Sequence, residues 1–227
     1  MGIVDNFPRW AQRAYFRTLR PRLFRRYLYL GQTIRETKAR RILEIGVWTG
    51  LQAEQMIRAA QRFHGNNVEY YGFDLFEEMT PERFKKAVAK NPPKMAVVQK
   101  DLEKTGAKVR LFKGPTETTL PEAAKELPVM DVIYIDGDHS LEGVAKDWEN
   151  VQPFIGPKTV VIFDDYWNRT DEGAKPLVDA INRRKFKVEV LPITDKVRKP
   201  DGLLTIQFAR VRLNRSAGRT GRSRRPK

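Results

Sequence analysis

Two short apolar segments in the centre of the chain, residues 132–135 and 160–163, are each followed directly by acidic residues. Both segments are rich in β-branched side chains and a stretch with helical spacing separates them, which is typical of two buried parallel strands joined by a helix. In open α/β sheets, ligands bind at the carboxyl ends of the strands. We therefore expect a set of polar side chains to converge at this edge: Asp136, Asp138, His139, Asp164 and Asp165.

The alternation of apolar strands and helical stretches continues on both sides of this centre. Residues 41–45 form an apolar segment, and residues 51–63 behind it have helical spacing. Prolines, glycines and charged stretches separate the remaining segments. The pattern predicts an α/β fold with a mostly parallel sheet. Further strands are expected at about 70–74, 109–113, 187–191 and 203–209, and further helices at about 81–90, 94–105 and 171–185.

The start of the chain is basic and amphipathic. Residues 7–19 and 23–34 have helical spacing, and Pro21 between them is a predicted break. We interpret the two stretches as helices that pack on the core and expose arginine faces to solvent. Two alternatives stay open, an anionic membrane surface or a nucleic acid, because basic and aromatic residues interleave here.

The charge of the chain is concentrated at its ends. The net charge is +15 over 227 residues, of which residues 1–41 carry +9 and residues 210–227 carry +8, whereas the middle carries −2. The last residues have no apolar pattern, which predicts a disordered tail. We therefore divide the chain into basic N-terminal helices at 1–40, one α/β domain at 41–210 and a basic tail at 211–227.

Composition excludes several kinds of site. The chain has no cysteine, which excludes disulfides, zinc–thiolate centres and thiol nucleophiles. It has no apolar run of about 18 residues and no signal-peptide pattern. We therefore expect a cytoplasmic protein without a transmembrane segment.

A glycine-containing turn, E-x-G-x-x-x-G, follows the first predicted strand and runs from Glu44 to Gly50. Gly46 and Gly50 allow a tight turn with close backbone approach, and the helix N-terminus behind them favours a polar ligand. The turn differs from the G-x-G-x-x-G of dinucleotide enzymes, and an ordinary strand-to-helix turn is the alternative.

Polar residues at the ends of two further predicted strands support a ligand-binding edge. Asp74 lies 28 residues beyond Gly46, somewhat more than the roughly 20 typical of an acid that binds a ribose hydroxyl pair. Leu75 is placed either to flank a flat ring or to join the core. Residues 114–116, Gly-Pro-Thr, offer polar contacts to the edge of the same ring, and a helix cap at Thr118 or Thr119 is the alternative.

The three aspartates after the central strands need charge compensation. Carboxylates in one crevice repel each other unless a proton or a cation lies among them. A hard divalent ion such as Mg²⁺, which takes oxygen ligands, is the natural occupant. The alternative is that such aspartates cap the following helices, which explains one of them more easily than the whole set.

The order of these segments resembles the class I S-adenosylmethionine-dependent methyltransferases. More narrowly, residues of about 40–210 are similar to their metal-dependent small-molecule O-methyltransferase branch, which includes catechol O-methyltransferase and the macrolide sugar O-methyltransferases. That branch has an Asp at the end of its fourth strand and a D-D or D-N pair at the end of its fifth. Asp136 precedes Asp164 by 28 residues, which fits this spacing. The resemblance implies a Rossmann-like, seven-stranded, mostly parallel sheet with an antiparallel last strand and helices on both faces.

The resemblance also implies the cofactor site. Glu44 and Gly46 would line the methionine end of S-adenosylmethionine, and Asp74 would hold its ribose. Trp48 stands where the catechol branch has an aromatic residue. The full set of expected cofactor-binding residues is Glu44, Gly46, Trp48, Gly50, Asp74, Leu75, Gly114, Pro115, Thr116 and Asp136.

The catalytic apparatus is implied in the same way. Asp136, Asp164 and Asp165 match the ligands of the divalent cation, Mg²⁺ or another, and Asp136 also counts as a catalytic residue. His139 stands where the branch has its catalytic base, three residues after Asp136. With an unperturbed pKa of about 6.5, His139 can take a proton at neutral pH, and a nearby cation would keep its ring neutral. A helix-start residue bonded to the backbone is the alternative for His139.

We expect methyl transfer to a hydroxyl of a small molecule, since the reaction needs a positioned methyl group and a nucleophilic oxygen that a metal can orient. One alternative is an RNA or DNA methyltransferase that uses the basic termini. Another is a non-catalytic protein that binds the cofactor or a nucleic acid. The retained metal and base positions argue against both. A homo-oligomer, the identity of the acceptor and the choice among Mg²⁺, Mn²⁺ and Ca²⁺ stay open.

Overall fold

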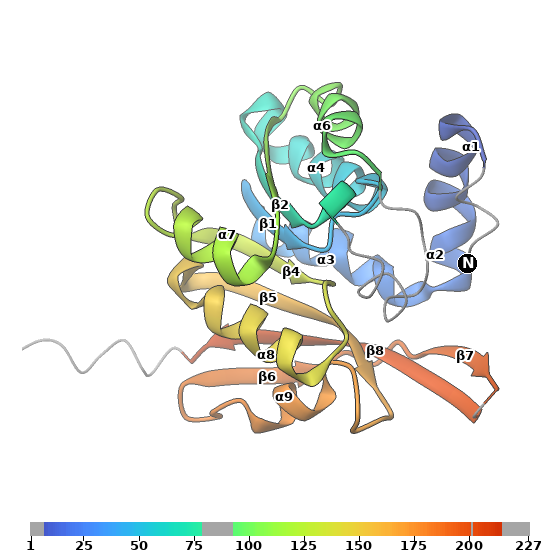
Figure 1. The fold of residues 1–227 in the computed structure, drawn as a ribbon, viewed down its shortest axis with the longest axis vertical. Helices are drawn as coiled ribbons and strands as arrows, with labels where there is room; N and C mark the ends of the chain where they lie inside the picture. The colour runs from blue at the N-terminus through green and yellow to red at the C-terminus, as the bar shows by residue number, and fades with distance from the viewer. Residues whose placement is uncertain (1–6, 79–92, 201, 215–227) are drawn as a thin grey trace, which may run out of the picture.

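A twisted sheet forms the centre of the protein (Figure 1), for which a computed structural model describes residues 7–78, 93–200 and 202–214. The strand order is β3-β2-β1-β4-β5-β8-β6, and β7 pairs with β8 outside this path. The pairs among β1 to β5 are parallel, whereas β8 runs antiparallel to β5, β6 and β7. The strands are β1 (Arg41–Ile45), β2 (Glu69–Asp74), β3 (Lys108–Lys113), β4 (Met130–Ile135), β5 (Ile155–Trp167), β6 (Phe186–Val190), β7 (Asp195–Lys199) and β8 (Gly202–Leu213).

The predicted Rossmann-like fold with a mostly parallel sheet is confirmed, although the described residues form eight strands rather than seven. The additional strand is β7, in a segment without an apolar pattern. β8 is long, and its second half pairs with β6 from Ala209 onwards. Its first half extends beyond β6, and β7 fills that edge with Asp195 opposite Ile206.

Helices cover both faces of the sheet because alternate strand residues point to opposite sides. Ile42 and Tyr134 belong to one core cluster, and Leu43 and Ile135 belong to the other. The first cluster is completed by α3 (Leu28–Thr37), α4 (Leu51–His64) and α6 (Met95–Glu103). The second is completed by α7 (Thr116–Ala123), α8 (Leu141–Asn150) and α9 (Lys175–Ala180). In this group α8 contacts both α7 and α9, and all three pack on the same face of the sheet (Figure 1).

The helix predicted at residues 94–105 is confirmed as α6, whereas the helix predicted at residues 171–185 is wrong in length. Only Lys175–Ala180 is helical. Gly173 has a positive φ of 81°, and its N–H donates to the carbonyl of His139 at 2.7 Å, so the chain before α9 is a turn. Ile181 leaves the helical region and is buried. The helix predicted at residues 81–90 lies outside the described residues.

The N-terminal segment continues through the predicted break. It consists of α1 (Arg9–Ala14), a π-helical turn (Tyr15–Leu19) and α2 (Arg20–Leu23), followed by a 3₁₀ helix (Arg25–Tyr27). The prediction that Pro21 interrupts the helix is wrong. Proline lacks the N–H of a regular helical turn, and the wider π-helical turn directly before α2 accommodates this loss.

The apolar residues of this segment are divided between the core and the surface. Leu30 and Ile34 of α3 are buried, as the predicted packing requires. In contrast, Trp10 is 74% exposed, and Leu19 and Leu23 are more than half exposed. The π-helical turn already lies beside α4, but among the described side chains of this segment burial begins only after α2, at Arg26.

The last strand, β8, lies inside the sheet between β5 and β6. β8 continues to Leu213, so residues 211–213 are part of a strand. Residues 215–227, where a disordered tail is predicted, lie outside the described residues. No helix in the described part of the chain is long and apolar enough to cross a membrane.

The turn after β1 passes against the end of β4, and Gly46 makes this approach possible. Its N–H donates to the carbonyl of Phe73 at 2.9 Å, and its φ is +88°. A Cβ atom at this position would lie 1.9 Å from the carbonyl oxygen of Asp136. Only glycine fits there without movement of one of the two loops.

We expect Gly46→Ala to destabilise the protein by at least about 2 kcal/mol more than Gly65→Ala, measured by urea unfolding. Both positions have a positive φ, so each alanine stores backbone strain on the order of 1–3 kcal/mol. At Gly65 no described atom lies within 4 Å of an added Cβ, so the control isolates the clash. Equal losses of stability in the two variants would contradict the close approach of the β1 and β4 loops.

Candidate active site

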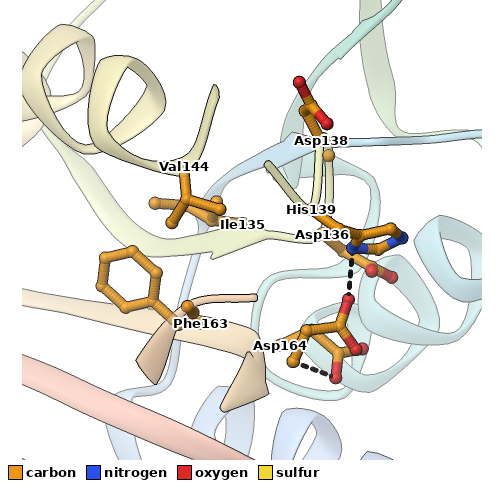
Figure 2. Close-up of a pocket in the computed structure, with 10 residues that line it drawn as sticks. Ile135, Asp136, Asp138, His139, Val144, Phe163 and Asp164 are labelled. Carbon is orange, nitrogen blue, oxygen red and sulfur yellow. Dashed lines mark hydrogen bonds and ion pairs between the residues drawn. The ribbon is translucent and has the colours of Figure 1, made fainter. Parts of the chain in front are cut away.

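A small hollow lies at the carboxyl ends of β4 and β5, where the sequence predicts converging polar side chains. Figure 2 shows Asp136, His139 and Asp164 close together on one side of it, with the apolar side chains of Ile135, Val144 and Phe163 on the other. Aspartates at the ends of neighbouring strands therefore meet a largely apolar wall. The residues that line the hollow are Ile135, Asp136, Gly137, Asp138, His139, Val144, Phe163, Asp164, Asp165 and Ala174.

Asp164 and Asp165 both reach the hollow because the strand is irregular at this point. Consecutive side chains of a regular strand point to opposite faces. Asp165 has a φ of +55°, and the register between β5 and β8 shifts between Phe163 and Tyr166. This local break in alternation turns the second carboxylate back towards the site.

Asp165 holds the ring of His139. Nδ1 of His139 lies 2.7 Å from Oδ2 of Asp165, and Oδ1 of Asp165 accepts a hydrogen bond of 2.8 Å from Nε1 of Trp167. The rings of His139 and Trp167 are tilted neighbours with centroids 5.3 Å apart. Nε2 of His139 has no hydrogen-bond partner among the described residues, so it is the nitrogen available to a ligand.

The carboxylates around His139 raise its pKa. Burial alone would lower the pKa, but the hydrogen bond to Asp165 and its charge outweigh burial, and the charges of Asp136 and Asp164 act in the same direction. Together they raise the pKa of His139 to about 9. The ring is therefore mostly protonated at neutral pH in the absence of a ligand.

Tyr134 links the other two aspartates. Its hydroxyl lies 2.9 Å from Oδ2 of Asp136 and 2.8 Å from Oδ2 of Asp164. Asp164 also accepts a hydrogen bond of 2.7 Å from the N–H of Asp165. The two carboxylates thus share one phenol as a neighbour.

Arg26, from the 3₁₀ helix before α3, forms a buried ion pair with Asp164. Its Nε donates to Oδ1 at 2.8 Å and its Nη2 to Oδ2 at 3.4 Å, and the two side chains are 5% and 1% exposed. Burial alone would raise the pKa of Asp164, but the charge of Arg26 and its hydrogen bond hold that pKa below its usual range. Asp164 is therefore a permanently compensated anion.

Asp138 lines the hollow, but its carboxylate does not join the other three. Figure 2 shows it pointing away from them. Its oxygens accept hydrogen bonds from the N–H of Ser140 at 3.0 Å and from the Ser140 hydroxyl at 2.8 Å. Ser140 in turn caps α8 by accepting the N–H of Gly143. Asp138 therefore supports the start of a helix, which the sequence allowed as the alternative for such aspartates.

The predicted divalent ion does not fit the donors as they are arranged. Both oxygens of Asp164 accept hydrogen bonds from Arg26, Tyr134 or the backbone, and both oxygens of Asp165 face the ring nitrogens of His139 and Trp167. The charges of Arg26 and of protonated His139 already lie against these oxygens, and they would repel a divalent ion placed among them. Within residues 7–78, 93–200 and 202–214, no three His, Cys, Asp or Glu side chains form a group that could hold a metal ion. The structure therefore gives no support to the predicted Mg²⁺.

The predicted cofactor residues come together at the ends of β1 to β4. Asp74 joins three loops: its oxygens accept the N–H groups of Trp48 at 2.6 Å and Phe76 at 2.9 Å, and its carbonyl accepts the N–H of Gly114 at 3.0 Å. Burial raises the pKa of Asp74, and the backbone hydrogen bonds oppose this rise. Gly46 brings Asp136 of the β4 loop against the same cluster.

Several of these residues also have internal partners that the sequence did not indicate. Glu44 is buried and accepts a hydrogen bond from the hydroxyl of Tyr70. The Thr116 hydroxyl donates to Asp147 at 2.6 Å, and burial, opposed by this bond, raises the pKa of Asp147 to about 7. Of the remaining members, Gly50 and Pro115 precede α4 and α7, and Leu75 is half-buried beside Asp74.

Sequence reasoning missed three residues of the site: Arg26, Tyr134 and Asp195. Arg26 is one of many N-terminal arginines, and Tyr134 lies within an ordinary apolar strand. Asp195 belongs to a segment without an apolar pattern, yet it is buried and accepts a hydrogen bond from Nη1 of Arg26 at 2.9 Å. A weak signal for Tyr134 is its place two residues before Asp136, on the same side of the strand.

Comparisons with known proteins agree with this arrangement. A family model described as a methyltransferase domain matches residues 43–166, which is more than half of the chain. No curated protein matches the chain. The matched range begins in β1 and ends in β5, so it contains the loops of the candidate cofactor site and the aspartates of the hollow.

Solved structures share the fold at low sequence identity. The calicheamicin methyltransferase CalS11 has a TM-score of 0.62 and 17% identity, with 90% of this chain and 88% of that chain covered. The O-methyltransferase TomG from Streptomyces achromogenes, solved with S-adenosylmethionine, has a TM-score of 0.56 and 16% identity, with 89% and 88% covered. An O-methyltransferase from Bacillus cereus, solved with S-adenosylhomocysteine, has a TM-score of 0.55 and 15% identity, with 91% and 93% covered.

The predicted resemblance to the class I methyltransferases is thereby confirmed for the fold and the family. The sheet has the predicted parallel part and antiparallel last strand, and the first-strand loop and both strand-end aspartate positions lie inside the matched range. On this evidence, the chain belongs to the methyltransferase-domain family.

Proposed function

We propose that the protein is an S-adenosylmethionine-dependent O-methyltransferase that methylates a hydroxyl of a small molecule, with His139 as general base. The observation that carries this proposal is the pair of His139 and Asp165 beside the loops that contain Gly46 and Asp74. Transfer of a methyl group to a hydroxyl requires a proton acceptor in a fixed orientation next to the cofactor site.

The comparisons support the choice of cofactor and acceptor. TomG and the Bacillus cereus enzyme are O-methyltransferases whose structures contain S-adenosylmethionine and S-adenosylhomocysteine. CalS11 is described as a TDP-rhamnose 3′-O-methyltransferase. We carry over the cofactor and the class of acceptor, a hydroxylated small molecule, but not the particular sugar.

His139 accepts the proton in the proposed mechanism. Asp165 holds Nδ1, so Nε2 faces outward and takes the proton of the acceptor hydroxyl. The acceptor oxygen gains the methyl group that bound S-adenosylmethionine supplies, while the S–CH₃ bond breaks and the sulfonium becomes a thioether. Asp165 then stabilises the imidazolium through the same Nδ1 contact, as the acid of a catalytic triad does.

The cofactor would lie across the ends of β1 to β4. The carboxylate of Asp74 lies where the loops after β1 and β2 meet, so we place the ribose hydroxyls of the cofactor against it. Glu44, Gly46, Trp48, Gly50, Leu75, Gly114, Pro115, Thr116 and Asp136 complete the proposed site. The proposed mechanism needs no divalent ion, because Arg26 and His139 compensate the charges of Asp164 and Asp165.

Calorimetry should detect S-adenosylhomocysteine binding by the wild type, and Asp74→Asn should weaken that binding at least about tenfold by removing a charge-assisted acceptor. Asp131→Asn is the matched control. Asp131 also accepts two backbone N–H groups, from Arg40 and Arg41 at 2.8 and 2.9 Å, but at the opposite edge of the sheet. Equal affinities of the two variants for S-adenosylhomocysteine would show that the cofactor does not bind at Asp74.

The His139→Ala variant should bind S-adenosylhomocysteine as the wild type does but lose on the order of 10²–10⁴-fold in methyl transfer. The measurement is release of S-adenosylhomocysteine with a panel of hydroxylated small molecules as acceptors. If this variant retained the wild-type rate, His139 would not be the general base, whereas the proposed cofactor site would be unaffected by that result.

Methyl transfer should increase as the pH rises towards 9, because the general base must be deprotonated and its pKa is about 9. Asp165→Asn should move this rise to lower pH, since Asp165 contributes most of the upward shift. NMR titration checks the same pKa without an acceptor: the chain has only two histidines, and His64→Ala assigns the resonances. A His139 ring that titrates below pH 7 in the wild type would refute this electrostatic account.

A further inference from the structure

Arg26 lies where a cation is needed in this site. It forms two hydrogen bonds with the Asp164 carboxylate, and a third N–H donates to Asp195. All three side chains are at most 5% exposed, so water cannot compete for these bonds. The guanidinium also lies over the ring of Tyr27, with 4.4 Å to the centroid, and donates to its hydroxyl at 3.1 Å.

We propose that the guanidinium of Arg26 is the resident cation of the site, compensating Asp164 in place of a divalent metal ion, so that the site works without one. This inference rests on the proposed function, whose cofactor and base it leaves unchanged. The planar fork of Arg26 matches the two oxygens of a carboxylate, which a metal ion would otherwise coordinate. Arg26 therefore acts through Asp164 as a positioning residue.

β7 contributes to this arrangement from outside the sheet that the sequence predicts. Asp195, its first residue, accepts the N–H of Arg25 at 2.8 Å and of Arg26 at 3.3 Å, in addition to Nη1 of Arg26. The same carboxylate thus holds the backbone and the side chain of the residue that carries the cation. β7 and the 3₁₀ helix before α3 thus hold Arg26 together, through the carboxylate of Asp195.

The remaining aspartates have neighbours of their own. His139 lies against Asp165, and the hydroxyl of Tyr134 lies between Asp136 and Asp164. Carboxylates this close require positive charge or shared protons. Arg26, His139 and Tyr134 supply both from within the chain.

Binding of Mn²⁺ to the full-length protein, followed by electron paramagnetic resonance, tests the proposal without any turnover. After treatment with EDTA and desalting, the wild type should bind Mn²⁺ no more tightly than on the order of 1 mM, the weak end of biological divalent sites. Arg26→Met should bind Mn²⁺ at least about tenfold more tightly, because Asp164 loses its compensating charge. Arg25→Met, a change at the neighbouring exposed arginine, should bind as the wild type does.

Stoichiometric micromolar binding of Mn²⁺ by the wild type would overturn the proposal, and so would a folded Arg26→Met variant without any gain. Circular dichroism establishes whether that variant folds, and the wild-type measurement decides the matter if it does not. Methyl transfer by the wild type should be equal with EDTA and with added Mg²⁺. Loss of transfer in EDTA alone contradicts this inference, whereas absence of transfer and of S-adenosylhomocysteine binding under all conditions contradicts the proposed function instead.

Discussion

Negative charge at the carboxyl edge of β4 and β5 is the constraint on which the rest of the site depends. Asp164 and Asp165 lie in the last part of β5, directly after its buried apolar residues 160–163. Each carboxylate is removed from water and therefore needs a partner from the chain. Arg26 is the partner of one and His139 of the other. Docking of the N-terminal segment, the hydrogen bonds of Asp195 and the orientation of the histidine all follow from this need for compensation.

The sequence predicts the parts of the fold that local patterns specify. Apolar strands with acidic ends, such as residues 132–136, can be recognised because periodicity and strand-end chemistry are written within a few residues. The same holds for α6 and for the glycine turn after β1. β7 lacks such a pattern. It pairs with the part of β8 that extends beyond β6 and would otherwise be an unpaired edge. Its formation depends on contacts with segments far away in the sequence, such as the bonds of Asp195 to Arg25 and Arg26.

The candidate site is predictable to the same extent. Residue type and strand position predict that Asp136, Asp164, Asp165 and His139 meet, because parallel strands end at one edge. Which donors they meet is not predictable in this way. Arg26 is 138 residues from Asp164 in the chain, and one of the ten arginines of residues 1–41 gives no local sign that it is buried. The charge of the aspartates predicted a divalent ion, which the structure does not support, whereas the cation that lies against Asp164 is the side chain of Arg26.

The two adjacent aspartates differ in a way that has chemical consequences. A guanidinium keeps its proton at any pH that the fold survives, so the charge on the Asp164 side is fixed. An imidazole can lose its proton, so the charge on the Asp165 side changes with the state of His139. Because Asp164 is compensated separately, the proton on His139 depends mainly on Asp165 and on whatever binds at Nε2. One residue of strand irregularity at Asp165 thus separates a carboxylate paired with a guanidinium from one that holds the ring of His139.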